Sequence, residues 1–96
     1  MPQTNKSAFL TALAKMGLKQ FPDAVQLFQV VLANKTDESF HDEADYFLAL
    51  AYLADHQEQK GLNKIAQINA NPNHTYYPLI HQIPALDMKI IELKKK

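Results

Sequence analysis

The sequence predicts an all-α fold, and three observations support this prediction. Apolar residues recur three and four positions apart through most of the chain, which is the spacing of amphipathic helices. Polar segments and prolines divide these stretches at short intervals. In addition, residues 8–34 fall without a gap on residues 45–71 when they are moved forward by 37 positions. A fixed period of this length indicates stacked units, each unable to bury its apolar face alone.

The repeat preserves residue size and polarity more than identity. Its matched positions are Phe9 with Tyr46, Ala12–Ala14 with Ala49–Ala51, Met16 with Leu53, Ala24 with Gly61, Phe28 with Ile65, Val31 with Ile68 and Ala33–Asn34 with Ala70–Asn71. Arrays of this kind are usually binding scaffolds rather than enzymes. The sequence therefore predicts a fold and a class of function, but it does not name a partner.

The first repeat is expected to hold two helices. The first covers about residues 5–19, where the apolar positions are Phe9, Leu10, Leu13, Met16 and Leu18. The second covers about residues 22–33, because Pro22 is tolerated in a first turn and Asp23 suits the positive end of the helix dipole. A polar connector follows over residues 34–37.

The second repeat is expected to hold the next two helices. Ser39 followed by Asp42 resembles a capping box, although Thr36 or Asp37 could equally start the third helix, which ends near residue 54. The fourth helix covers about residues 57–70, and the segment 71–73 around Pro72 ends it.

The last part of the chain reads as one or two further helices. Residues 76–83 form a short helix with Pro78 in its first turn, and Pro84 ends it. Tyr76 and Tyr77 are expected to pack a loop onto the fourth helix. From residue 84 to about 94 a helical stripe continues through Leu86, Ile90 and Leu93, although a strand over residues 88–93 is an alternative.

Composition bounds the class of protein. Ninety-six residues with 47% hydrophobic content suggest one domain, residues 1–96, with a core of its own. A formal net charge of zero argues against a nucleic-acid partner, which requires a basic face. No cysteine is present, and no apolar run is long enough to insert into a membrane. Without a secretory signal, a cytoplasmic location is the default, unless the chain is part of a longer protein.

The repeat residues resemble the tetratricopeptide repeat family. Leu48, Ala49 and Tyr52 stand where that family has its Leu-Gly and Tyr, Gly61 stands at its small second-helix position, and residues 71–73 match its proline-containing end. The period of 37 residues exceeds the family's ~34, and no tryptophan occurs. The resemblance implies two units, residues 5–34 and 39–72, in a fragment of a right-handed superhelix, with residues 76–95 as capping helices. An unrelated helical bundle would also fit.

The resemblance also implies a binding surface. In the family, the first helices of successive units line a concave face that receives a peptide or a helix. The matching positions in this chain, called the partner face below, are Lys6, Phe9, Leu13, Met16, Glu43, Tyr46, Leu50 and Leu53, with Gly17 and Ala54 beside them. The family members that clamp a peptide carboxylate use lysine and asparagine here, and only Lys6 remains, so that specificity is not expected.

A mostly apolar face must be covered or used. We expect the chain's own last residues to fold back on it through Ile83, Leu86, Ile90 and Leu93, and a second copy or an outside helix are the alternatives. The predicted function is a non-catalytic protein–protein interaction module. The alternative is a structural or oligomerisation domain of a larger membrane-linked or signalling protein.

Chemistry is the least supported function. His41 and Asp45 are spaced to share a helix face and could bridge a metal, but a charged first turn explains them equally well. His74 and His81 flank the two tyrosines without a carboxylate or cysteine nearby in sequence. We therefore expect no metal, no cofactor and no catalytic residue, with a histidine site as the lesser alternative.

Overall fold

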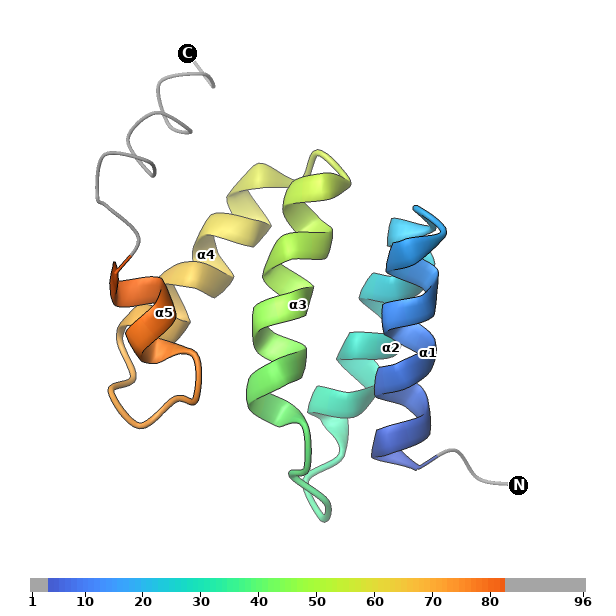
Figure 1. Cartoon of the computed structure of the whole chain (residues 1–96), viewed down its shortest axis with the longest axis horizontal. Helices are drawn as coiled ribbons and strands as arrows, with labels where there is room; N and C mark the ends of the chain where they lie inside the picture. Colours follow the sequence, from blue (N-terminus) through green and yellow to red (C-terminus); the bar gives the residue numbers. More distant parts are fainter. Residues whose placement is uncertain (1–3, 83–96) are drawn as a thin grey trace.

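A computed structural model describes residues 4–82 of the chain. It confirms the all-α prediction, since every regular element in this range is a helix: α1 (Asn5–Gly17), α2 (Phe21–Ala33), α3 (His41–Ala54), α4 (Glu58–Asn69) and α5 (Tyr77–Gln82). Successive long helices run antiparallel and each packs against the next, with the short α5 beside α4 (Figure 1). The expected helix over residues 84–94 and the fold-back of Ile83, Leu86, Ile90 and Leu93 lie outside the described residues.

The core consists of two adjoining clusters. The first joins α1, α2 and α3 through Ala8, Phe9, Ala12, Ala24, Val25, Phe28, Val31, Ala44, Leu48, Ala51 and Tyr52. The second joins α3, α4 and α5 through Ala49, Ile65, Ile68 and Ile80, with the partly buried Tyr46, Leu53 and Tyr76 packed against it. Alanines dominate where helices cross closely, since a small side chain lets two backbones approach. Gly61 serves this purpose on α4: a Cβ there would lie 2.7 Å from Leu53 and 3.1 Å from the Ala49 carbonyl oxygen.

The two hairpins turn in the same way at positions 37 residues apart. After α1, Lys19 takes a left-handed conformation, and the Gln20 N–H donates to the Lys15 carbonyl at 2.8 Å. After α3, His56 takes the same conformation, and the Gln57 N–H donates to the Tyr52 carbonyl at 2.8 Å. Both are Schellman motifs, in which a left-handed residue closes the last turn. The motif ends α1 at Gly17 rather than at the expected residue 19.

The first helix of each hairpin also carries an aromatic stack on its first half. Phe9 of α1 stacks on Phe40, with ring centroids 5.1 Å apart, and Tyr46 of α3 stacks on Tyr76 at 4.5 Å. Phe40 and Tyr76 each stand immediately before the next helix, and each carbonyl accepts the N–H four residues on, from Ala44 and Ile80 respectively. The start of α5 therefore repeats the start of α3. From the sequence, Tyr76 is expected to pack onto the fourth helix; its ring stacks on Tyr46 of α3 and also packs against the second cluster, which includes Ile65 and Ile68 of α4.

The predicted capping box at the start of α3 is also wrong. α3 begins at His41, and its N-cap residue Phe40 is left-handed (φ 66°) and makes no side-chain cap. The Ser39 N–H instead donates to the Asp37 carboxylate at 3.0 Å, and the Asp42 carboxylate accepts from Thr75. Ser39 thus forms a local turn with Asp37, and Asp42 is used in a contact with a residue 33 positions away.

Candidate functional site

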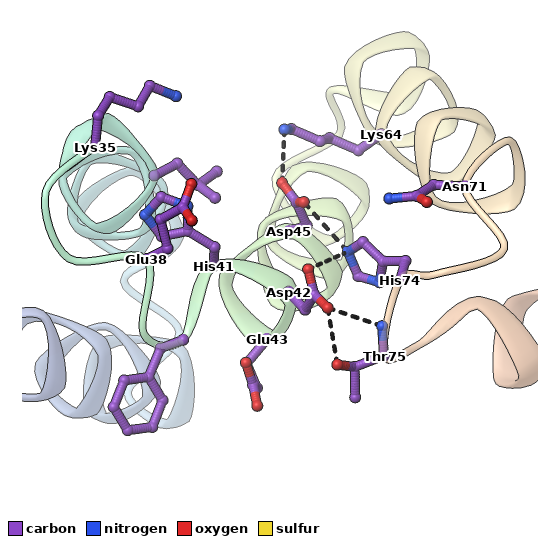
Figure 2. A pocket seen from close by; sticks show the side chains of 12 residues that line it. Lys35, Glu38, His41, Asp42, Glu43, Asp45, Lys64, Asn71, His74 and Thr75 are labelled. Carbon is purple, nitrogen blue, oxygen red and sulfur yellow. Dashed lines mark hydrogen bonds and ion pairs between the residues drawn. The ribbon is translucent and has the colours of Figure 1, made fainter.

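Two surfaces are candidates for function: the partner face on α1 and α3, and a polar depression beside the first turn of α3. α1 and α3 are neighbours, since the rings of Phe9 and Phe47 meet edge to face at 6.0 Å. The depression has a volume of about 620 Å³ and lies between the end of α2, the start of α3 and α4 (Figure 2).

The structure divides the eight residues of the partner face among different environments. Phe9 is 6% exposed and belongs to the first cluster, so it offers little area to a partner. Leu13 and Met16 are partly buried against that cluster. Tyr46 and Leu53 pack instead on the second cluster. Lys6 is exposed, Glu43 is partly buried at the rim of the depression, and Leu50 is partly buried but belongs to neither cluster.

Sequence reasoning left Leu10 out of this face. Leu10 is 51% exposed and lies on the same side of α1 as Lys6 and Leu13, at spacings of four and three. The signal available in the sequence was its helical spacing from Lys6 and Leu13.

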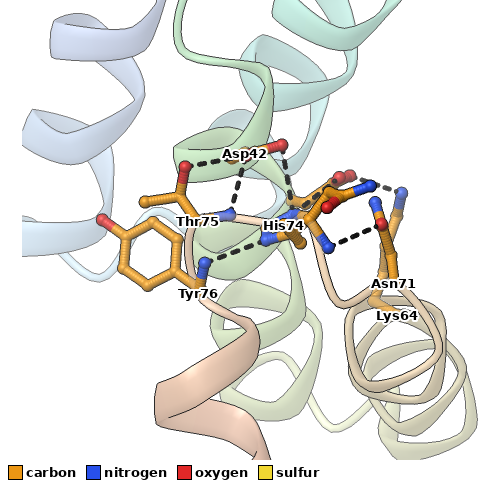
Figure 3. A network of polar contacts seen from close by, with 8 residues as sticks. Asp42, Lys64, Asn71, His74, Thr75 and Tyr76 are labelled. Carbon is orange, nitrogen blue, oxygen red and sulfur yellow. Dashed lines mark hydrogen bonds and ion pairs between the residues drawn. The ribbon is translucent and has the colours of Figure 1, made fainter.

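The polar depression is built around a tie between α3 and the connector that follows α4. Its members, called the second tie below, are Asp42, Asp45, His74 and Thr75. The backbone N–H and the hydroxyl of Thr75 each donate to Asp42 Oδ2 at 2.8 Å, and Lys64 of α4 donates to Asp45 Oδ1 at 2.9 Å (Figure 3). The sequence predicted no contact among these residues, because 29 or more positions separate His74 and Thr75 from the two aspartates.

His74 is the buried centre of this tie, with 5% of its surface exposed. Its Nδ1 accepts the Tyr76 backbone N–H at 3.1 Å, so the ring proton resides on Nε2. Nε2 lies 3.2 Å from Asp45 Oδ2 and 3.5 Å from Asp42 Oδ1. The geometry therefore assigns a neutral imidazole that donates to carboxylates on one side and accepts from the backbone on the other.

The contacts in and near the second tie, and in the connector before α3, shift the pKa values of three groups. Burial disfavours the charged form of Asp42, but the hydrogen bonds from Thr75 and the nearby His74 and His41 outweigh it and hold the pKa of Asp42 below its ordinary value. Burial, together with Glu43 and Tyr46, raises the pKa of Tyr76 above its ordinary value. A Ser39 hydrogen bond lowers the pKa of the exposed Asp37.

A matching polar cluster occurs in the first hairpin, at positions 37 residues earlier, and is called the first tie below. The first tie consists of Asn5 and its hydrogen-bond partners. Asn5 is the position matched to Asp42, and it is 3% exposed. Its amide donates to the carbonyls of Asp37 at 2.7 Å and Ser39 at 3.2 Å, and its oxygen accepts from Asn34 at 3.1 Å. In each hairpin, a polar residue at the start of the first helix thus holds the connector that follows the second helix.

The second tie does not fit a metal ion well, although ligand atoms of Asp42, Asp45 and His74 lie within 4.8 Å of one another. A metal would need the Nε2 lone pair, so the ring proton would move to Nδ1, where it would face the Tyr76 N–H. Asp45 is also neutralised by Lys64. The His41–Asp45 pair considered from sequence is not formed as a site either, because His41 donates to the Asn34 carbonyl at 2.9 Å.

The tie also lacks the order of groups needed for nucleophilic catalysis. A triad places the histidine between the hydroxyl and the carboxylate. Here the carboxylate of Asp42 lies between Thr75 and His74, so the imidazole cannot take the hydroxyl proton. The side chain of His81, the other histidine considered from sequence, lies outside what the structure describes.

Comparison with models of known protein families finds none that matches the chain, and neither the curated proteins nor the solved structures yield a match. Within residues 4–82, no helix combines the length and the apolar character that crossing a membrane requires.

Proposed function

We propose that the chain is a non-catalytic protein-interaction module that binds a helix or a peptide on the partner face of α1 and α3. The proposal rests mainly on Leu50 and Leu10, one on each first helix. Leu10 is 51% exposed and Leu50 is partly buried, and neither belongs to a core cluster in the described part of the chain. What favours a binding role for these two leucines over other exposed apolar residues is their position on the first helices, which line the concave face in the family that the chain resembles.

The neighbours of these leucines support the same role. Leu13 and Met16 lie near Leu10 on α1 and are only partly buried, so a partner could cover these three side chains together with Leu50 of α3. Each side chain that becomes fully buried contributes up to about 1–2 kcal/mol. Lys6 and Glu43 lie in the first turns of α1 and α3 and are suited to orient a partner by charge.

Photo-crosslinking at single positions tests this proposal. A photoreactive residue placed at position 50 should crosslink to a partner protein in cells, whereas one placed at Val30, which is 52% exposed on α2, should not. The substitution Leu50→Asp should abolish the crosslink formed from position 13, and Val30→Asp should leave it intact. Far-ultraviolet circular dichroism verifies that both variants are folded.

The outcomes separate the hypotheses. Crosslinks that form equally at positions 50 and 30, or that survive Leu50→Asp, would reject the partner face. A crosslinked product of twice the chain mass would make the partner a second copy, and light scattering over a range of concentrations would then measure the dimer directly. Leu50 is preferable to Tyr46 for this test, because Tyr46 is part of the Tyr76 stack and its removal would disturb α5.

A further inference from the structure

We propose that His74 is a pH-sensitive latch: its neutral ring holds the start of α5 against α3, and protonation of the ring releases it. This inference is independent of the partner face. It rests on the hydrogen bonds of a buried imidazole whose two nitrogens have opposite roles, one donating and one accepting (Figure 3).

The neutral state satisfies both nitrogens. Nε2–H donates to Asp45 at 3.2 Å, and Nδ1 accepts from the Tyr76 N–H at 3.1 Å. A second proton can enter only at Nδ1, since Nε2 already carries one. An N–H group would then face the Tyr76 N–H at hydrogen-bond distance, and two donors repel each other. Protonation therefore breaks the bond between the ring and the Tyr76 backbone.

The charged groups around the ring hold it against α3. Asp42 and Asp45 face Nε2 from α3, and both attract a positive ring. Lys64 on α4 neutralises part of the Asp45 charge. His41, on α3, helps to lower the pKa of Asp42. The ring therefore stays with the carboxylates when it gains charge, and the Tyr76 backbone is the partner that must move.

Tyr76 transmits the change to α5. Its carbonyl accepts the Ile80 N–H at 3.0 Å, so it forms the head of the helix, and its ring stacks on Tyr46. Ile80 is 5% exposed and belongs to the second cluster. When Tyr76 leaves Nδ1, we expect the aromatic stack to loosen and the Tyr46 ring to become accessible.

The first tie provides a comparison within the same molecule. Asn5 holds its connector through amide and carbonyl groups, none of which titrates near neutral pH. His41 also contacts this connector, but it donates through Nε2 to the Asn34 carbonyl, and a protonated ring still donates. Acidification should therefore release the Tyr76 N–H, while Thr75 stays bonded to Asp42, and it should leave the first connector in place.

Nuclear magnetic resonance on the whole chain tests the latch. Imidazole nitrogen shifts report the tautomer of His74, and amide exchange, corrected for intrinsic rates, reports protection of the Tyr76 N–H. The measurement runs from about pH 8 to about pH 5, where histidine side chains in general change charge, and follows the conversion of the Nε2–H form of His74 to the charged form. Over the same range, Tyr76 protection should fall about tenfold, as expected for one lost hydrogen bond. Amides of the first connector should not change.

Two substitutions are matched to this test. His74→Asn places an amide oxygen near the position of Nδ1 and cannot titrate, so Tyr76 protection should be the same at both pH values. His56→Asn removes an exposed histidine far from the tie and should leave the transition intact. The latch is overturned if His74 adopts the Nδ1–H tautomer or stays neutral throughout. It is also overturned if Tyr76 protection is constant while His74 titrates. These wild-type measurements decide the matter even if His74→Asn does not fold.

Discussion

Replacing Asn5 by alanine is expected to reduce the free energy of unfolding by about 2 kcal/mol, although the substitution removes no apolar contact. The substitution removes donors to the Asp37 and Ser39 carbonyls and the acceptor for the Asn34 amide. Each net hydrogen bond contributes about 1 kcal/mol, which gives a loss of about 3 kcal/mol. Water can reach part of the connector, and alanine is the better helix former by about 0.5 kcal/mol, so about 2 kcal/mol remains.

The isosteric substitution Asn5→Asp should cost more, about 3 kcal/mol. It turns the two-hydrogen donor into a carboxylate oxygen that faces two carbonyl oxygens, and burial of the charge adds to the repulsion. A negative charge in the first turn of α1 returns only about 0.5 kcal/mol through the helix dipole. The matched position in the second hairpin, Asp42, accepts hydrogen bonds from Thr75, which explains why an aspartate is tolerated there.

Thermal and urea unfolding, followed by far-ultraviolet circular dichroism, measures both effects. In a domain of this size, about 2 kcal/mol corresponds to a fall in Tm of roughly 10 °C. Ser7→Ala, at an exposed position in the same turn, is the control and should stay within about 0.5 kcal/mol of the wild type. If Asn5→Asp unfolds at the same urea concentration as Ser7→Ala, the first tie does not stabilise the fold and the reasoning fails.

Four further outcomes are expected. His56→Gly should raise the free energy of unfolding by about 1 kcal/mol, because it relieves a left-handed conformation (φ 61°), and an unchanged urea midpoint would argue against this strain. Gly61→Ala should lower the free energy of unfolding by about 1 kcal/mol, because the clash with Leu53 exceeds the gain in helix propensity. Gly17 has open space around it, so Gly17→Ala should raise the free energy of unfolding in the same assay. Tyr76, whose pKa is raised, should ionise at a higher pH than free tyrosine in an ultraviolet absorbance titration. The contribution of this shift to folding stability is complete below about pH 10 and is lost as the pH rises through the folded pKa. Added zinc should leave Tm unchanged near neutral pH, and a rise that saturates with zinc would overturn the assignment of the second tie.

Much of the helical architecture could be predicted from local patterns. Apolar spacing, Pro22 and the segment around Pro72 located four helices to within a few residues, since periodicity and backbone constraints act over a few positions. The errors fell where a local signal had a competing long-range partner. Ser39 resembled a cap, but its connector is held by Asn5, more than thirty positions away in sequence.

In the candidate sites too, local patterns predicted positions along the helices but not contacts between distant residues. Placing Lys6, Leu13 and Leu50 on first helices required only the repeat, but the burial of Phe9 depends on the rings of Phe28 and Phe40, which reach it from other elements. The second tie was missed because neither His74 nor Asp45 is unusual by itself. A signal existed in the offset of 37 residues that relates Asn5 to Asp42 and Asn34 to Asn71.

The sequence alone determined that this chain is helical, where its helices break, and that two segments repeat, because these properties depend on the order of apolar, polar and proline residues over short distances. The tertiary structure decided which polar side chains meet. Hairpin closure brings Asn5 to the first connector and His74 to Asp42 and Asp45, and only then do the burial of the imidazole and the roles of its two nitrogens exist. Contacts between distant residues depend on packing geometry, which no local pattern contains.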